Sequence, residues 1–205
     1  MMDSLAQRVD AVVIGASAGG IEALSILLPA LPPGLRAAVF VVQHLPRDRA
    51  SLLVDIFAPR CAVTLQEAQD KLPIEPGNVY FAPPDYHLLL DAGPQLALSV
   101  DAPVHYSRPA IDVLFQSAAE LYGPRLLGIV LTGGNQDGAE GLAAVRAAGG
   151  LTAVQDPADA QMPLMPECAL AKGPADFVLP LRALAHLLGT LDAASRQATS
   201  ARSAA

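Results

Sequence analysis

The feature that most constrains the fold of this chain is a set of short, almost wholly apolar runs separated by segments of helical character. Three of these runs are Ala11–Gly15, Ala37–Gln43 and Leu126–Leu131. Strands that are buried on both faces of a parallel sheet have this pattern, because helices cover both of their faces. The alternation therefore predicts an α/β fold with a doubly wound, mostly parallel sheet and helices on both faces.

The other segments extend the same alternation. We predict helices over residues 20–28, 49–57, 109–122, 138–148 and 181–188, and further strands over 63–66, 79–82, 86–90, 95–100, 151–155 and 177–179. In the helix over 49–57, the apolar face is predicted to contain Leu52, Leu53, Ile56 and Phe57. The turn Asp91-Ala92-Gly93-Pro94 predicts a small β-hairpin insertion.

We expect a single domain over residues 11–189. A lead of residues 1–10 precedes it, and a flexible tail of residues 190–205 follows, because that tail contains few large apolar side chains.

Composition excludes several classes of function. Twenty Asp and Glu against thirteen Lys and Arg give a formal charge of -7, the opposite of what binding to nucleic acid phosphates requires. The longest apolar runs are about a third of the roughly 20 residues that a membrane-spanning helix needs, so no membrane insertion is expected. Two cysteines, Cys61 and Cys168, are too few for a disulfide framework and lack zinc-ligand spacing. We expect a cytoplasmic protein.

Ligands of doubly wound sheets bind outside the carboxyl ends of the strands, so the residues that follow each strand are the candidates for function. The segment Gly15-Ala16-Ser17-Ala18-Gly19 follows the first buried strand and precedes a helix. It matches the sharp strand-to-helix turn that presents a nucleophilic serine. A phosphate-binding loop is an alternative, although no Lys-Ser, Lys-Thr or Gly-x-Gly-x-x-Gly pattern is present. A plain tight turn is the third.

A serine nucleophile needs a base, and histidine is the usual one. His44 ends the second buried strand, whose carboxyl end should lie beside that of the first, so it is better placed than His87, His105 or His186. The alternative is a histidine that bonds a loop carbonyl.

The third member of such a site is a carboxylate that orients the imidazole. Asp137 lies in the glycine-rich loop after the strand Leu126–Leu131 and could reach the same edge. Its alternative role is to cap the helix that follows. Asp85, Asp112 and Asp156 are rivals, and Asp112 is most simply a first-turn helix residue.

Five segments, in order along the chain, closely resemble the catalytic domain of CheB-type chemotaxis protein-glutamate methylesterases. They are Val12-Val13-Ile14-Gly15-Ala16-Ser17-Ala18-Gly19-Gly20, Val41-Val42-Gln43-His44-Leu45-Pro46, Ala82-Pro83-Pro84-Asp85-Tyr86-His87, Arg108-Pro109-Ala110-Ile111-Asp112-Val113-Leu114-Phe115, and Leu131-Thr132-Gly133 with Asp137-Gly138.

The resemblance implies a serine hydrolase that demethylates glutamyl methyl esters in the cytoplasmic region of chemoreceptors or of similar signalling proteins. Many members also deamidate receptor glutamines. Ser17 would be the nucleophile, His44 the base and Asp137 the orienting acid, with no metal and no cofactor. Because only about ten residues precede the first strand, we expect a stand-alone catalytic domain without the receiver domain of larger members.

The family pattern has Ser-Thr-Gly-Gly at the serine and Thr-Gly-Met-Gly before the acid. Ala18 replaces the Thr and Gly134 replaces the Met. The family's oxyanion donor in the second loop is a backbone N–H, which Gly134 keeps, so Ala18 and Gly134 are the predicted oxyanion and substrate contacts. Two other functions stay open: an esterase of the same fold that acts on a different protein, and a partner-binding module without activity.

Overall fold

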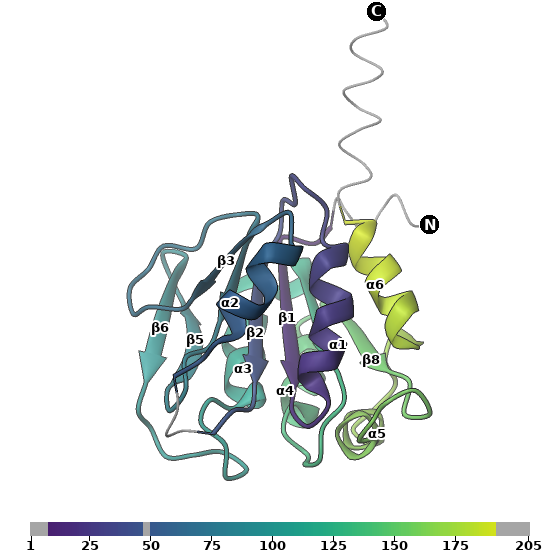
Figure 1. Ribbon diagram of the computed structural model, residues 1–205. Helices are drawn as coiled ribbons and strands as arrows, with labels where there is room; N and C mark the ends of the chain where they lie inside the picture. Colours follow the sequence, from purple (N-terminus) through teal and green to yellow (C-terminus); the bar gives the residue numbers. More distant parts are fainter. Residues whose placement is uncertain (1–7, 47–49, 192–205) are drawn as a thin grey trace, which may run out of the picture.

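The computed structural model describes residues 8–46 and 50–191. Seven strands form one sheet in the order β3-β4-β2-β1-β7-β8-β9, and all neighbours within it are parallel (Figure 1). The strands are β1 (Ala11–Ala16), β2 (Ala38–Gln43), β3 (Thr64–Glu67), β4 (Asn78–Phe81), β7 (Leu126–Val130), β8 (Leu151–Gln155) and β9 (Phe177–Leu179). The predicted doubly wound parallel sheet is therefore confirmed.

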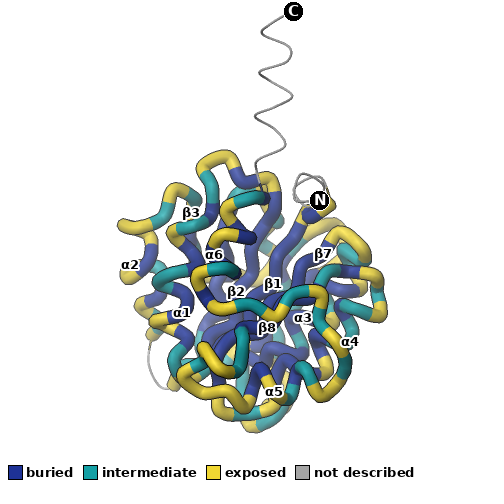
Figure 2. The backbone as a smooth tube through the Cα atoms, turned by 90° about the vertical axis from the view of Figure 1, so that its right-hand side faces the viewer, coloured by how far each residue is buried: buried dark blue, intermediate teal, exposed yellow. Residues whose placement is uncertain are grey.

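Helices cover both faces of this sheet, as predicted. In Figure 1, α1 (Gly20–Leu27), α2 (Leu53–Phe57) and α6 (Leu181–Gly189) lie in front of the strands, and α3 (Ile111–Tyr122) and α4 (Ala139–Ala147) lie behind them. Alternate residues of the central strand serve the two sides: Val12 and Ile14 belong to one hydrophobic core, and Ala11 and Val13 to the other. Figure 2 shows the buried strands enclosed between half-exposed helices.

The predicted hairpin is also present. Strands β5 (His87–Asp91) and β6 (Gln95–Ser99) pair antiparallel in a separate two-stranded sheet. Their buried leucines, among them Leu88 and Leu96, belong to the core that also contains the apolar side of α3. Three short 3-10 helices complete the described elements: η2 (Leu28–Ala30), η3 (Ala58–Arg60) and η4 (Gly123–Arg125).

The prediction of the second helix was wrong in its apolar face. Helix α2 has only five residues, so it makes little more than one turn and can bury one narrow side. Leu53 and Phe57, which are four residues apart, are buried, whereas Leu52 is 61% and Ile56 40% exposed. The predicted start of this helix, at residue 49, lies outside the described residues.

One further boundary and one whole helix differ from the prediction. Helix α3 begins at Ile111 rather than at residue 109, since Ala110, the residue before it, has an extended backbone with φ -110° and ψ 140°. Helix α5 (Leu164–Ala171) has no counterpart in the prediction; it contains Pro166, and a proline normally argues against a helix interior. Pro166 lies in the first turn, where the missing N–H breaks no helical hydrogen bond.

Both chain ends lie mostly outside the described residues. Of the predicted lead, Val9 is buried against the core, and of the predicted tail, Leu191 is buried as well. Residues 1–7 and 192–205, including most of the predicted flexible tail, are not described. None of the helices in the described part of the chain is long and apolar enough to span a membrane.

Candidate active site

The three strand ends that attracted attention in the sequence meet at one edge of the sheet. Strand β1 pairs with β2 on one side and with β7 on the other, so the order of the strands reverses at β1. The carboxyl ends of these strands lead directly to Ser17, His44 and the loop that carries Asp137. This is the position at which doubly wound sheets bind their ligands.

Ser17 lies in a sharp turn between β1 and α1. Its N–H donates to the carbonyl of Thr132 at 3.0 Å, and the N–H of Gly20 donates back to the Ser17 carbonyl at 2.9 Å. Gly19, the residue before α1, has φ +81°, a left-handed conformation that glycine adopts without strain. The turn therefore holds a half-buried serine at the N-terminus of α1, as the sequence predicted.

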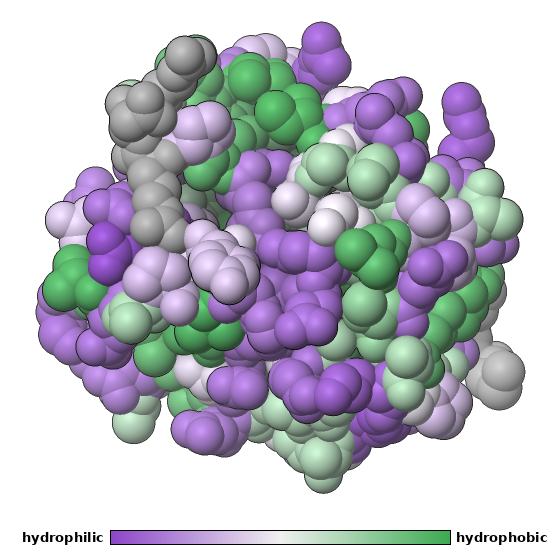
Figure 3. Space-filling model, turned by 90° about the horizontal axis from the view of Figure 1, so that it is seen from below, coloured by the Kyte–Doolittle hydropathy of each residue, from purple (hydrophilic) through white to green (hydrophobic). Residues whose placement is uncertain are grey.

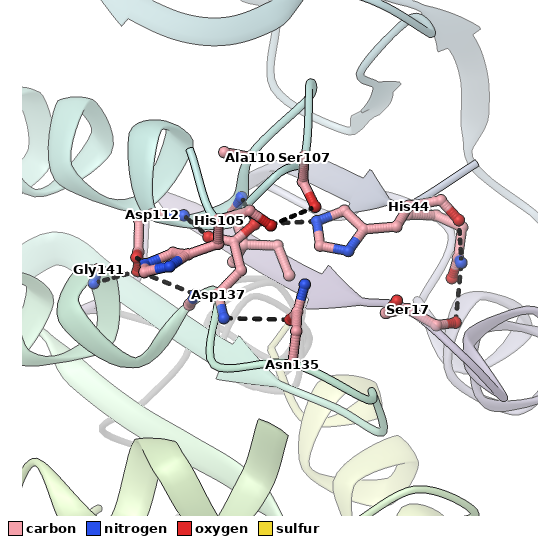
Figure 4. Close-up of polar contacts among 12 residues, drawn as sticks. Ser17, His44, His105, Ser107, Ala110, Asp112, Asn135, Asp137 and Gly141 are labelled. Carbon is pink, nitrogen blue, oxygen red and sulfur yellow. Dashed lines mark hydrogen bonds and ion pairs between the residues drawn. The ribbon is translucent and has the colours of Figure 1, made fainter. Parts of the chain in front are cut away.

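His44 reaches Asp137 across the edge of the sheet. Its Nε2 lies 2.9 Å from Asp137 Oδ2, and their side chains are 13% and 0% exposed. Because a carboxylate accepts, Nε2 carries the hydrogen and Nδ1 is the nitrogen with a free lone pair. Figure 4 shows Nδ1 on the side of the ring where Ser17 lies. Within the described part of the chain, Ser17 Oγ makes no hydrogen bond, and such contacts commonly tighten only when substrate binds.

The carboxylate of Asp137 is held by the N-terminus of α3. Its two oxygens accept from the N–H groups of Ile111, at 2.7 Å, and Asp112, at 2.9 Å. The alternative role from the sequence, a cap on the following helix α4, is not what the structure has. Asp112 does that work instead: its Oδ1 accepts from Gly138 N–H at 2.9 Å and Gly141 N–H at 2.6 Å. Asp137 thus binds the start of α3, the helix that contains Asp112, and Asp112 binds the start of α4, the helix that follows Asp137. We call these contacts the crossed caps.

A second histidine binds the other carboxylate of the crossed caps. His105 Nε2 lies 3.2 Å from Asp112 Oδ2, and its Nδ1 lies 3.1 Å from the side-chain amide of Gln136. Burial raises the pKa of Asp112; the N–H of Gly141 counteracts this, and the nearby charge of Asp137 raises the pKa further. From the sequence, His105 was only a loop residue; its contact with Asp112 appears only in the structure.

The remaining candidate residues from the sequence have other partners or lie at the surface. His87 is buried, accepts from Ala110 N–H at 3.2 Å, and lies 3.2 Å from the carbonyl of Ala102 through its other nitrogen. His186 is exposed on α6. Asp85 binds the Arg108 guanidinium, at 2.7 Å for the shorter contact. Asp156 accepts from Ala158 N–H, at 2.9 Å, in a local turn.

Sequence reasoning gave no role to Gln43, which links the serine to the histidine. Its Nε2 donates to the carbonyls of Ser17 and His44, at 2.9 Å each, and the residue is 4% exposed. A glutamine at the end of an otherwise apolar buried strand is the signal that could have drawn attention to it. The contact fixes the serine turn against the strand end that carries the histidine.

The predicted oxyanion positions flank the serine. Ala18 and Gly134 are both exposed, and in the described structure neither N–H donates a hydrogen bond. Their loops are joined, because Thr132 Oγ1 donates to the Ala18 carbonyl at 2.9 Å.

A pocket of about 500 Å³ opens beside Ser17 and His44, between α1 and α2. Ile21, Ile56 and Arg60 are among the residues that line it. Figure 3 views this edge of the sheet and shows hydrophilic surface across the middle with hydrophobic patches on either side. Among the described residues, no group of three or more His, Cys, Asp or Glu side chains could hold a metal ion.

Comparison with known proteins agrees with this geometry. A model of the family described as CheB methylesterase matches residues 12–188. This chain belongs to the CheB methylesterase family. A crystal structure of the Thermotoga maritima CheB methylesterase catalytic domain superimposes with a TM-score of 0.85 and 34% identity, over 89% of this chain and 98% of that one. The resemblance inferred from the five sequence segments, and the fold it implied, are confirmed.

Two curated CheB relatives differ in their own lengths. A Leptospira interrogans protein, named provisionally as a protein-glutamate methylesterase/protein-glutamine glutaminase, is 42% identical over 89% of this chain and 95% of its own length. A protein-glutamate methylesterase/protein-glutamine glutaminase of Symbiobacterium thermophilum is 40% identical over 91% of this chain. This chain spans 51% of the Symbiobacterium protein.

Proposed function

We propose that this chain is a protein-glutamate methylesterase with Ser17 as nucleophile, His44 as general base and Asp137 as the acid that orients His44. The observation that carries the proposal is the placement of His44: Nε2 binds buried Asp137 at 2.9 Å, while the ring borders the turn of Ser17. Membership of the CheB methylesterase family supports the same reaction.

The reaction follows from this arrangement in two steps. Ser17 Oγ attacks the carbonyl carbon of the glutamyl ester while His44 Nδ1 takes its proton. The bond from carbon to the methoxy oxygen then breaks, and methanol leaves with that proton. Water attacks the resulting glutamyl-enzyme, His44 again takes a proton, and glutamate and free Ser17 are released. The hydrogen bond from Nε2 to Asp137 keeps the imidazole in one tautomer and stabilises its charged form throughout.

The negative charge on the carbonyl oxygen needs donors near Ser17. We assign this role to the backbone N–H groups of Ala18 and Gly134, which flank the serine and have no acceptor in the described structure. Ala18 precedes the N-terminus of α1, where the helix dipole also favours an anion.

The proposed substrate is the methylated cytoplasmic region of a chemoreceptor or of a similar signalling protein, which places the enzyme in the cytoplasm. The curated relatives are named for glutaminase activity as well. Glutamine deamidation would use the same attack on a side-chain carbonyl, with ammonia in place of methanol as the leaving group, so we include it as a second reaction of the same site.

Methanol release from receptor membranes that carry methylated glutamates tests the proposal. The wild-type chain should release methanol, and the Ser17→Ala variant, in which a small residue still fits the turn, should not. Covalent labelling by a fluorophosphonate should attach to Ser17 in the wild-type chain only. Methanol release at an unchanged rate by folded Ser17→Ala protein would refute the assignment of the nucleophile.

A further inference from the structure

Asn135 lies in the loop between β7 and α4, which borders the serine turn directly. Ser17 N–H donates to the Thr132 carbonyl at 3.0 Å, and a Cβ on Gly133 would lie 3.0 Å from Ser17 Cβ. Asn135 follows two residues later and is half-buried. Figure 4 shows its side chain beside Asp137, on the side of the loop toward His44 and Ser17, although no role was given to it from the sequence.

One end of the Asn135 amide is fixed by the loop itself. The N–H of Asp137 donates to Asn135 Oδ1 at 3.1 Å, and a flipped amide would place two N–H groups against each other. The nitrogen Nδ2 must then point away from Asp137. It has no hydrogen-bond acceptor in the described part of the chain, and Figure 4 shows it on the side of the loop that faces His44 and Ser17. The loop thus presents an oriented N–H donor without a partner.

We propose that Asn135 is a catalytic residue whose Nδ2–H donates a hydrogen bond to the oxyanion of the tetrahedral intermediate. This inference rests on the proposed function. When Ser17 Oγ bonds to the carbonyl carbon, the π electron pair of the carbonyl moves to its oxygen, and Asn135 stabilises that charge. When the pair returns, the bond to methoxide breaks and methanol leaves with the proton held by His44.

Two observations make Asn135 suited to this work. Its orientation is set before substrate arrives, by the bond to Asp137 N–H, so no reorganisation is needed when charge develops. In the Thr-Gly-Met-Gly form of this loop, the position of Asn135 is glycine, whereas this chain has Thr132-Gly133-Gly134-Asn135. The Asn135 side chain therefore supplies a donor in addition to the backbone N–H groups of Ala18 and Gly134.

Hydrolysis of p-nitrophenyl acetate and labelling of Ser17 by a fluorophosphonate test the proposal without the protein substrate. For the Asn135→Ala variant we expect kcat to fall about 10²-fold with KM within about threefold, because a single oxyanion donor typically contributes that much. The labelling rate should fall by a similar factor. The matched control is Gln136→Ala, which removes the neighbouring amide that contacts His105, and its rates should stay within about twofold of wild type.

The Asn135→Asp variant separates the donor role from the turn. A carboxylate oxygen can still accept from Asp137 N–H, but the N–H donor is gone. The rate is compared at the plateau of the pH profile of each variant. We expect a plateau at least as low as that of Asn135→Ala, and a plateau within threefold of wild type would overturn the proposal.

The outcomes also separate this proposal from the function on which it rests. If the wild-type chain reacts, Ser17→Ala does not, and Asn135→Ala reacts like wild type, the role of Asn135 is refuted and the serine hydrolase stands. If the wild-type chain neither hydrolyses the ester nor takes up the label, both are refuted. Thermal melting of each variant identifies loss of rate that comes from unfolding.

Discussion

The molecule contains two histidine–aspartate pairs with almost the same chemistry and different surroundings. In His44–Asp137 and in His105–Asp112, Nε2 of the ring contacts a buried carboxylate that also binds backbone N–H groups at a helix start, at 2.9 and 3.2 Å respectively. The difference lies at the other ring nitrogen. Nδ1 of His44 faces the turn of Ser17, whereas Nδ1 of His105 accepts from the Gln136 amide.

This comparison shows that a histidine–carboxylate pair does not by itself identify a catalytic site. Such a pair orients a ring, and the group at the second nitrogen decides whether that ring can move a proton to a nucleophile. In this chain the two carboxylates are also joined through the crossed caps, so the pair without a nucleophile supports the pair that has one.

The largest expected difference is between the two histidines. We expect His44→Gln to lower kcat for methyl ester hydrolysis by about 10⁶-fold, because loss of the base in a triad has an effect of that order. His105→Gln should stay within about tenfold of wild type, since Gln can still contact Asp112. Parallel measurements of kcat on both variants check this, and similar losses in the two would remove the distinction between the pairs.

Substitution of the two aspartates should change kcat in the same order as substitution of the histidines that they contact. We expect Asp137→Asn to lower kcat by about 10⁴-fold with little change in KM, because an amide holds the imidazole in the wrong tautomer and stabilises its charged form less. Asp112→Asn retains an oxygen for Gly138 and Gly141, and should reduce kcat by less than about tenfold. An Asp137→Asn protein that is unfolded, or that keeps its full rate, would leave the helix contact as the only role of Asp137.

Removal of the Asp112 carboxylate should affect stability more than rate. Asp112→Ala leaves two N–H groups at the start of α4 without their acceptor, and we expect the free energy of unfolding to fall by about 1–3 kcal/mol. The measurement is urea unfolding followed by circular dichroism. For comparison, Glu140→Ala removes an exposed ion pair with Lys172 and should change this free energy much less than Asp112→Ala does.

The smallest effect concerns pH. Because burial raises the pKa of Asp112 above its ordinary value, the folded state holds a proton that the unfolded state has lost, so this group stabilises the fold at acid pH. That contribution is complete below the unfolded pKa and disappears as pH rises through the folded pKa. Asp112→Asn should remove this slope from the pH dependence of unfolding. An identical slope in wild type and variant would contradict the raised pKa.

The parts predicted from the sequence are those that depend on local pattern and strand order. Ser17, His44 and Asp137 follow three buried strands, β1, β2 and β7, and the rule that parallel strands share one edge is enough to bring their loops together. Apolar runs predicted the central strands equally well, because nothing competes with burial there. Whether these residues act as a triad remains the proposal that the variants above test.

The parts that the sequence did not predict depend on contacts between distant segments. Asp112 contacts Gly138 and Gly141 across 26 and 29 residues, and no local pattern distinguishes this from an ordinary first-turn aspartate. Gln43 and Asn135 have roles set by the direction of an amide, which only the assembled loops determine. In helix α2, the apolar pattern overestimated burial because Leu52 lies just before the helix and is exposed, and Ile56 lines the open pocket beside α1.

The contact between Asp137 and the start of α3 has a dynamic consequence. The amide protons of Ile111 and Asp112 are covered by the same carboxylate that holds His44, so solvent can exchange them only when they separate from that carboxylate. Openings in which the carboxylate itself moves away also release the imidazole. Amide hydrogen exchange at these two positions therefore sets an upper limit on the fraction of time for which the proposed triad is disassembled, in the resting enzyme and without any substrate.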